Sequence, residues 1–258
     1  SGEGGGRIQV QGTRNTLQDN SAVRSETSGN LTGEDLVIRG SEQILVDADA
    51  YDPAVRNSLS TNTLADSKGD GGNMVLEAPL LQVLNLAWIT SDTRGAGDAG
   101  IISSQTDTLE AIGRGSDDFS FIRISSRVRP GATGNGGNFT VDAQRMVAAD
   151  ALIGTNTSGE GNAGNVMVEV DSLELIGGSQ LQTLTFGNGN AGKMVVRASE
   201  LIDIREVTEF LIFGEGVASS GLFTSAEPDS TGSGGSMIVE TEQLRIAEGG
   251  KITSNALG

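Results

Sequence analysis

Apolar residues recur along the chain at fixed distances from a pair of small residues, usually Gly-Gly or Ala-Gly. Counted from the first small residue, position three is apolar in all eight copies and position five in seven of them. Because alternate residues of a strand point to the same side, this spacing predicts short strands with one buried face. The small pairs begin at Gly5, Gly33, Gly71, Ala99, Gly136, Ala163, Ala191 and Gly234. The position-three column consists of Ile8, Leu36, Met74, Ile102, Phe139, Val166, Met194 and Met237.

The copies follow one another at a basic step of 27–28 residues, which lengthens to 38, 37 and 43 in three places. A further apolar column lies at position ten, and a third segment of apolar and Ser/Thr residues precedes each new small pair. One such triplet of strands cannot bury its apolar face alone, so the repeats must stack. We therefore expect an all-β fold, a right-handed parallel β-helix of about eight coils with three strands each. It would form a single domain over residues 1–258, roughly 40 Å long at the spacing of paired strands. The position-ten column consists of Leu81, Leu109, Met146, Leu173, Leu201 and Leu244.

The small residues and the asparagines fit this stacked arrangement. The chain has 38 glycines and 4 prolines, and glycine permits either a positive φ or close stacking at a tight corner. Asn73, Asn138 and Asn165 share one column after the corner, where their side chains would form a hydrogen-bonded ladder along the rod. Lys193 takes this position in another copy, so we expect the ladder to be partial.

Charge and composition exclude several classes of function. The net charge of −17 repels nucleic-acid phosphates and anionic lipid surfaces, so neither is an expected partner. The absence of Cys and His excludes Ser-His-Asp and Cys-His catalysis, thiolate metal sites and histidine-ligated metals. No apolar run reaches the length of about 18 residues that a membrane-spanning helix requires.

Three stretches carry a family resemblance: "GNAGNVMVEVDSLELIGGSQLQTLTFGNGNAGKMVV" (161–196), "GNGGNFTVDAQRM" (134–146) and "GSGGSMIVETEQLRIAEGGKITSNALG" (232–258). They resemble the repeats of filamentous-haemagglutinin-like large exoproteins of the cyanobacterial type, over about three quarters of the chain. The resemblance implies a two-partner secretion passenger, exported across the outer membrane and displayed on the cell surface or released as a secreted adhesin. The Asn-Pro-Asn-Gly type of export motif is absent, and both ends fall within a coil, so we expect a segment of a longer repeat protein.

The three lengthened repeats are the features most typical of a binding function. Their extra residues lie near 47–57, 113–121 and 206–220, always between the second and third predicted strands, and so on one edge of the rod. Insertions on one face of a solenoid often form its binding surface. Phe210, Leu211, Ile212 and Phe213, together with Tyr51, are the candidate partner-binding residues; the alternative is that the apolar run covers the core of its own coil. Trp88, beside Ile89 in a third segment, is expected to pack.

Two acidic groups are weaker candidates for chemistry. Asp47, Asp49 and Asp52 with Arg39 and Arg56 could serve a polysaccharide lyase, or could form a solvated loop. "GRGSDDFSF" (113–121) resembles a single calcium-binding nonapeptide, with Asp117 and Asp118 as ligands. Such ions lie between successive copies, so a turn-rich insertion is the expected interpretation and no cofactor is predicted, with calcium as the alternative.

Three functional hypotheses remain. The first is a non-enzymatic structural or adhesive rod outside the cell, which binds a protein or glycan through its edge loops. The second is a carbohydrate-active β-helix enzyme, which requires Asp and Arg or Lys side chains that converge on one face. The third is a component that assembles end to end through its strand edges.

Overall fold

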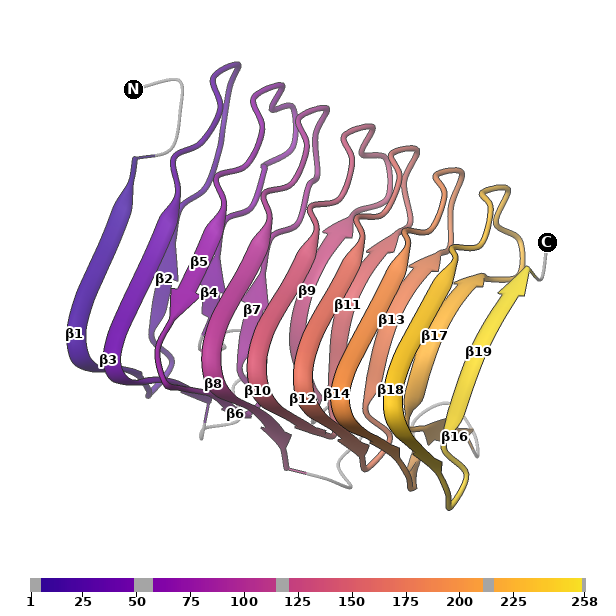
Figure 1. The fold of residues 1–258 in the computed structure, drawn as a ribbon. Coiled ribbons are helices and arrows are strands. Elements are labelled where there is room, and N and C mark those ends of the chain that lie inside the picture. The colour runs from indigo at the N-terminus through magenta and orange to yellow at the C-terminus, as the bar shows by residue number, and fades with distance from the viewer. Residues whose placement is uncertain (1–5, 49–57, 115–120, 211–215, 257–258) are drawn as a thin grey trace.

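The chain forms parallel strands that stack on one another in two large sheets (Figure 1). The computed structural model describes residues 6–48, 58–114, 121–210 and 216–256, and no helix occurs among them. Pairing in both large sheets is parallel throughout, so the expectation of an all-β, parallel, stacked fold is confirmed. The arrangement is compatible with a β-helix or solenoid.

The nine-stranded sheet, here called the long sheet, lies in front in Figure 1. Most of its strands join the first two predicted strands of a repeat into one, and only at Pro79 do two separate strands remain. Proline lacks the N–H that would continue the ladder, which explains the break. The strands are β1 (Ile8–Leu17), β3 (Leu36–Ala48), β5 (Met74–Glu77), β6 (Leu80–Asn85), β8 (Ile102–Gly113), β10 (Phe139–Ala149), β12 (Val166–Ile176), β14 (Met194–Ile204) and β18 (Met237–Ile246).

The eight-stranded sheet, here called the short sheet, lies behind the long sheet. Its first three strands have three residues each, whereas the next five have six or seven. A separate antiparallel hairpin, β15 (Val207–Phe210) and β16 (Gly216–Ser219), belongs to the third insertion. The short sheet consists of β2 (Ala22–Arg24), β4 (Ser58–Ser60), β7 (Trp88–Thr90), β9 (Ile122–Val128), β11 (Ala151–Thr157), β13 (Gln180–Thr185), β17 (Gly221–Ala226) and β19 (Lys251–Ala256).

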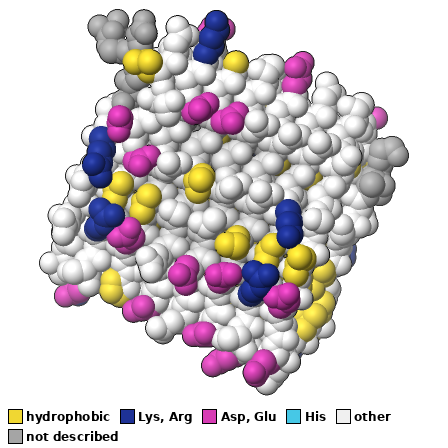
Figure 2. Space-filling model, turned by 45° about the horizontal axis from the view of Figure 1, so that its top comes forward, with side chains coloured by type: hydrophobic (Ala, Val, Ile, Leu, Met, Phe, Trp, Pro, Cys, Tyr) yellow, Lys and Arg dark blue, Asp and Glu magenta, His cyan; other side chains and the backbone are white. Residues whose placement is uncertain are grey.

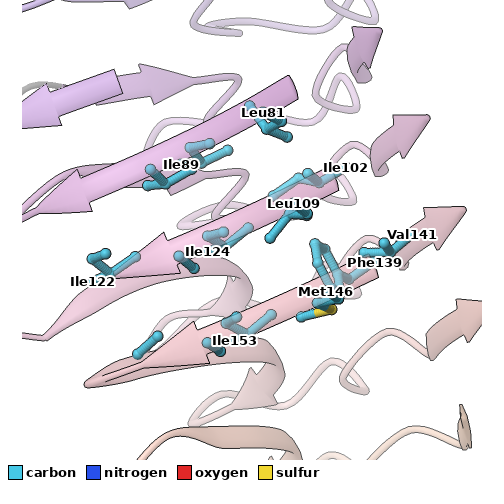
Figure 3. Close-up of a cluster of buried hydrophobic side chains, with 14 of the residues drawn as sticks. Leu81, Ile89, Ile102, Leu109, Ile122, Ile124, Phe139, Val141, Met146 and Ile153 are labelled. Carbon is cyan, nitrogen blue, oxygen red and sulfur yellow. The ribbon is translucent and has the colours of Figure 1, made fainter. Parts of the chain in front are cut away.

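The position-three column runs through the whole long sheet in unbroken register. Each of its eight members pairs with the next, from Ile8 with Leu36 to Met194 with Met237. The six inner members are buried, and the two at the ends are partly buried. The column packs against apolar side chains of the short sheet such as Ile89, Ile124 and Ile153 (Figure 3).

The position-ten column departs from its prediction in one place. Leu173 pairs with Ile202 rather than with Leu201, because β14 contains one extra residue at a register shift after Ala198. Ile202 is fully buried, whereas Leu201 is only partly buried. A bulge adds one residue to a strand without altering the composition of its neighbours, so counting along the sequence places the side chain one position too early.

The glycine corners are held by close stacking rather than by left-handed backbone. A Cβ on Gly137 would lie 1.9 Å from the carbonyl oxygen of Gly100, and one on Gly164 would lie 2.0 Å from that of Gly137. Neither glycine has a positive φ. The backbones of successive turns therefore approach so closely that any side chain would displace one of them.

Threonine hydroxyls fasten these turns from the inside. The Thr157 hydroxyl donates to the Gly161 carbonyl at 2.6 Å, and Thr93 donates to Gly97 at the same distance. Both threonines are fully buried. The strands of the short sheet thus begin with inward-facing apolar residues and carry inward-facing Ser or Thr nearer the turn. This order accounts for the Ser/Thr-rich third segment of each repeat.

Two rows of Asn and Asp side chains run along the outside of the turns. In the predicted row, Asn138 Oδ1 accepts from the main-chain N–H of Asn165 at 2.8 Å, and Asn165 Oδ1 accepts from Lys193 at 2.8 Å. The row is interrupted at Ile101, whose side chain has no acceptor, and is therefore partial. A second row, which was not predicted, is longer and consists of Asp70, Asp98, Asn135, Asn162 and Asn190.

Candidate binding face

A cleft crosses the outward side of the short sheet from β2 to β9. Small polar side chains form its floor, because the outward rows of β4 and β7 carry Ser, Thr and Asn. Charged side chains flank this floor, most of them arginines. We call this feature the arginine cleft, and it is lined by Arg24, Glu26, Ser58, Ser60, Asn62, Trp88, Thr90, Asp92, Arg94, Arg127 and Arg129.

Asp92 organises the arginines at one end of the cleft. Its side chain is only 2% exposed, and its carboxylate accepts two hydrogen bonds from Arg127, from Nε at 3.2 Å and from Nη2 at 2.8 Å. Arg129 contacts Asp92 Oδ2 through two nitrogens, Nε at 2.9 Å and Nη2 at 2.7 Å. Burial lowers the pKa of Arg127, and the charge and hydrogen bonds of Asp92 oppose that shift. One buried carboxylate therefore fixes two guanidinium groups.

Trp88 lies half-buried in the cleft, on the outward row of β7. The guanidinium carbon of its register partner Arg123 lies 5.4 Å from the centre of the Trp88 ring, a distance typical of a cation–π contact. Trp88 thus packs, as expected from the sequence, but it packs on the outer surface and not in the core.

The charge of the cleft differs from that of the rest of the molecule. Its lining has four arginines and two acidic residues, whereas the whole chain carries −17. On the face shown in Figure 2, acidic side chains outnumber basic ones. Arg24 and Arg94 form no ion pair with any residue that the structure describes, whereas Arg39 and Arg197 on the long sheet pair with Glu77 and Glu240 at 2.6 Å each.

A second charged group surrounds Arg205, just after β14. Its guanidinium contacts Glu174, Asp203 and Glu206, the last at 2.6 Å from Nη1. Burial lowers the pKa of Arg205, but the hydrogen bonds and charges of these carboxylates together outweigh burial and raise the pKa. Within the described part of the chain, no three acidic side chains gather closely enough to hold a metal ion.

Asp150 lies near this group, at the corner between β10 and β11. Burial raises the pKa of its carboxyl group, and the nearby charge of Glu206 adds to that effect. The Thr208 hydroxyl donates to Asp150 Oδ1 at 3.3 Å and opposes the shift. The hydrogen bond also ties the hairpin of the third insertion to the body of the rod.

The structure separates the candidate lyase residues that it describes. Arg39, near the start of β3, pairs with Glu77, whereas Asp47 near the end of the same strand accepts a hydrogen bond from Asn85. The two lie eight positions apart along an extended strand, about 26 Å before any bending. Arg39 and Asp47 therefore form no common site, while Asp49, Asp52 and Arg56 lie outside the described residues.

Most of the predicted edge residues also lie outside the described part of the chain. These are Tyr51, Asp117, Asp118, Leu211, Ile212 and Phe213. Phe210 ends β15, and its side chain is not among those described. The strands that precede the insertions end at Ala48, Gly113 and Ile204, within two register positions of one another, so the insertions do leave the long sheet at one edge.

The arginine cleft was not predicted from the sequence, although a signal was present. Aligned on Ile89 and Ile124, the third segments "WITSDTRG" and "FIRISSRVRPG" place Asp92 beside Arg127 and Arg94 beside Arg129. An acid beside a cation in neighbouring strands predicts a cross-strand pair. The alternation of inward and outward residues would then have placed the whole group on the outer surface.

Comparison with known proteins yields no relative. No protein-family model, curated protein or solved structure matches the chain. Among the described residues, no helix has the length and apolar character needed to cross a membrane.

Proposed function

We propose that this chain is a segment of an extracellular or cell-surface rod that serves a structural or adhesive role and binds a protein or glycan partner. In this proposal the stacked sheets are a right-handed β-helix of about eight coils, which belongs to a filamentous-haemagglutinin-like exoprotein exported by the two-partner route. The observation that carries the proposal is the unbroken register from Ile8 to Met237. A core that is continuous along the whole chain favours a stiff spacer that presents side chains on its outer faces.

The charges on the long sheet support a structural role for that face. Arg197 lies between Glu169 at 3.3 Å and Glu240 at 2.6 Å, and these three residues are register neighbours on adjacent strands. Exposed pairs of this kind contribute about 0–1 kcal/mol each. In these pairs each charged side chain has an oppositely charged partner within the protein, so this face needs no ligand to balance its charge.

The test is a binding screen in which beads coated with the whole chain are applied to arrays of glycans and of extracellular matrix proteins. The control beads carry albumin at the same surface density. We expect retention on at least one array above the albumin level. Retention on neither array would contradict the adhesive role, whereas sedimentation of the chain as filaments in an ultracentrifuge would favour end-to-end assembly instead.

A carbohydrate-active enzyme is the second candidate, favoured by the carboxylates around Arg205 and by the raised pKa of Asp150. It ranks second because Glu174, Asp203 and Glu206 already accept hydrogen bonds from three separate nitrogens of Arg205. Arg145 and Arg245 add ion pairs to Glu174 and Asp203. Release of new reducing ends from any polysaccharide on prolonged incubation, lost in a Glu206→Gln variant, would favour the enzyme over the rod.

A further inference from the structure

We propose that the arginine cleft binds an acidic polysaccharide through its carboxylate groups; the inference rests on the proposed adhesive function and names the partner. The cleft crosses four adjacent strands, β2, β4, β7 and β9. Three steps of about 4.8 Å between paired strands give it a run of about 14 Å along the rod. Arg24 stands at one end of this run and the pair Arg127 and Arg129 at the other.

The two inner arginines form a fixed anion-binding group. Arg127 and Arg129 each use Nε and Nη2 to contact Asp92, and neither Nη1 group has a hydrogen-bond partner among the described residues. The two guanidinium groups outweigh the single charge of Asp92, so the three side chains together carry a net charge of +1. The two guanidinium groups are therefore held in place before any ligand arrives, which reduces the entropy lost on binding.

The two outer arginines supply charge that is not neutralised within the protein. Arg24 and Arg94 are exposed and form no ion pair with any described residue. Together with the inner pair they outweigh Glu26 and Asp92, so the cleft is a positive strip on a strongly negative chain. An anionic polymer is attracted to such a strip and repelled by the surrounding surface, which would confine it to the cleft.

The lining of the cleft favours a sugar polymer over a nucleic acid. Ser58 is partly exposed and offers a hydroxyl group to a sugar, whereas Ser60, Asn62 and Thr90 are buried. Trp88 is half-buried with its indole nitrogen covered, so its exposed part offers a sugar ring an apolar contact only. Single-stranded nucleic acids stack successive bases on aromatic side chains, whereas Trp88 is the one aromatic residue among the described lining residues. Carboxylates match the planar fork of arginine in a bidentate contact.

The experiment uses the whole chain and oligogalacturonides in two forms, one with free carboxylates and one fully methyl-esterified. The two probes share the same sugar backbone and differ only in charge. We expect titration calorimetry to show binding of the free acid, weakening as salt is raised, and at least tenfold weaker binding of the ester. Equal binding of the two forms would overturn the proposal, as would preferential binding of a sulfated oligosaccharide or of single-stranded DNA.

The matched variants separate a specific cleft from general charge. Arg24→Gln with Arg94→Gln removes two exposed cations from the cleft, and no ion pair among the described residues is lost. Arg7→Gln with Lys193→Gln removes two exposed cations near the turns, with the same change in net charge. We expect at least tenfold loss of affinity for the first pair and an unchanged value for the second. Equal loss in both would show that charge alone is responsible and would overturn the cleft.

Failure of this inference is distinguishable from failure of the proposed function. If the beads adhere to the arrays while no oligogalacturonide binds, the rod remains an adhesin and the acidic polysaccharide is the wrong partner. If the oligogalacturonide binds in the cleft and the beads adhere to nothing, the site exists and the adhesive role is wrong.

Discussion

Asn138 Oδ1 accepts a hydrogen bond from the main-chain N–H of Asn165 at 2.8 Å, although 27 residues separate them in the sequence. This separation is one basic step of the repeat. The side chain of one turn therefore binds the backbone of the next, and it does so on the outside of the rod, where water competes for the same groups.

Loss of this acceptor gives a modest and specific effect. Asn138→Ala should lower the free energy of unfolding by about 0.5–1.5 kcal/mol, the usual contribution of one hydrogen bond. Asn138→Asp should retain most of the stability at neutral pH, because Asp98 already fills the same role in the second row, accepting from Asn135 at 2.7 Å. Urea denaturation of the three proteins measures the difference, and an equal loss in both variants would show that the acceptor is unimportant.

The glycine stack predicts a larger effect. Gly137→Ala would place a methyl group 1.9 Å from the Gly100 carbonyl oxygen, so the two turns must separate. Overpacking against side chains costs about 1–3 kcal/mol, and the rigid backbone partner here favours the upper end. Gly6→Ala is the control, since nothing lies within 4 Å of its added Cβ. A midpoint of thermal unfolding that fell equally in both would contradict the close stacking.

Two buried serines should respond in opposite directions. Ser104 stands in the position-five column between Leu76 and Val141, and its hydroxyl has no hydrogen-bond partner among the described residues. A buried, unsatisfied polar group costs about 1–3 kcal/mol, so Ser104→Ala should stabilise the fold.

Ser126 provides the comparison with identical chemistry. Its hydroxyl donates to the Ser91 carbonyl at 2.7 Å and accepts from the Gly137 amide at 2.8 Å, so Ser126→Ala should destabilise the fold by about 1–3 kcal/mol. Urea midpoints of the two variants that shift in the same direction would argue against the assigned roles.

A substitution at the end of the position-three column should lower the free energy of unfolding less than one at its centre. Phe139 is 1% exposed, and Phe139→Ala should cost about 3–5 kcal/mol because it leaves a cavity between two sheets. Met237→Ala, in the partly exposed final strand of the same column, should cost less. Equal losses, measured by chemical denaturation, would mean that the column is not a graded core.

Asp150 gives a prediction for pH. Its carboxyl group has a raised pKa in the folded state, so the folded protein binds its proton more tightly than the unfolded chain does. The protonated Asp150 therefore contributes to the free energy of unfolding at low pH. This contribution is lost as the pH rises from the pKa of the group in the unfolded chain to its pKa in the folded protein. Asp150→Asn removes the charge and keeps an acceptor for Thr208, and Asn tolerates the positive φ of 51° found there.

The measurement compares urea unfolding of the two proteins at acidic and neutral pH. We expect the variant to gain stability relative to the native chain as the pH rises. The comparison isolates Asp150 because all other carboxylates are shared. A difference that does not change with pH would contradict the raised pKa.

Much of the fold could be predicted because the buried apolar positions recur at a regular spacing along the sequence. Leu36 and Met74 are separated by 38 residues with an insertion between them, yet both follow a small pair by three positions and are register partners. The bulge at β14 could not be predicted, because the extra residue does not differ in type from its neighbours in the strand. The merging of two predicted strands into one was not predicted either, since it depends on backbone angles and not on the spacing of apolar residues.

The candidate site was far less predictable than the core. The apolar columns repeat eight times, whereas Asp92, Arg127 and Arg129 occur once and become neighbours only when the third segments are aligned. A single cross-strand group is invisible to a search for periodicity.

The contacts between coils have a mechanical consequence. The ladder hydrogen bonds run along the axis of the rod, so a pull on its two ends loads every junction between coils with the same force. At the start of the short sheet these bonds continue past the three-residue strands, as from the Thr61 and Thr63 amides to the Thr90 and Asp92 carbonyls. The junction of β4 and β7 therefore spans six positions, 58–63, just as that of β11 and β13 spans 152–157. Under tension the first coils should accordingly hold at this sheet as well as the later ones.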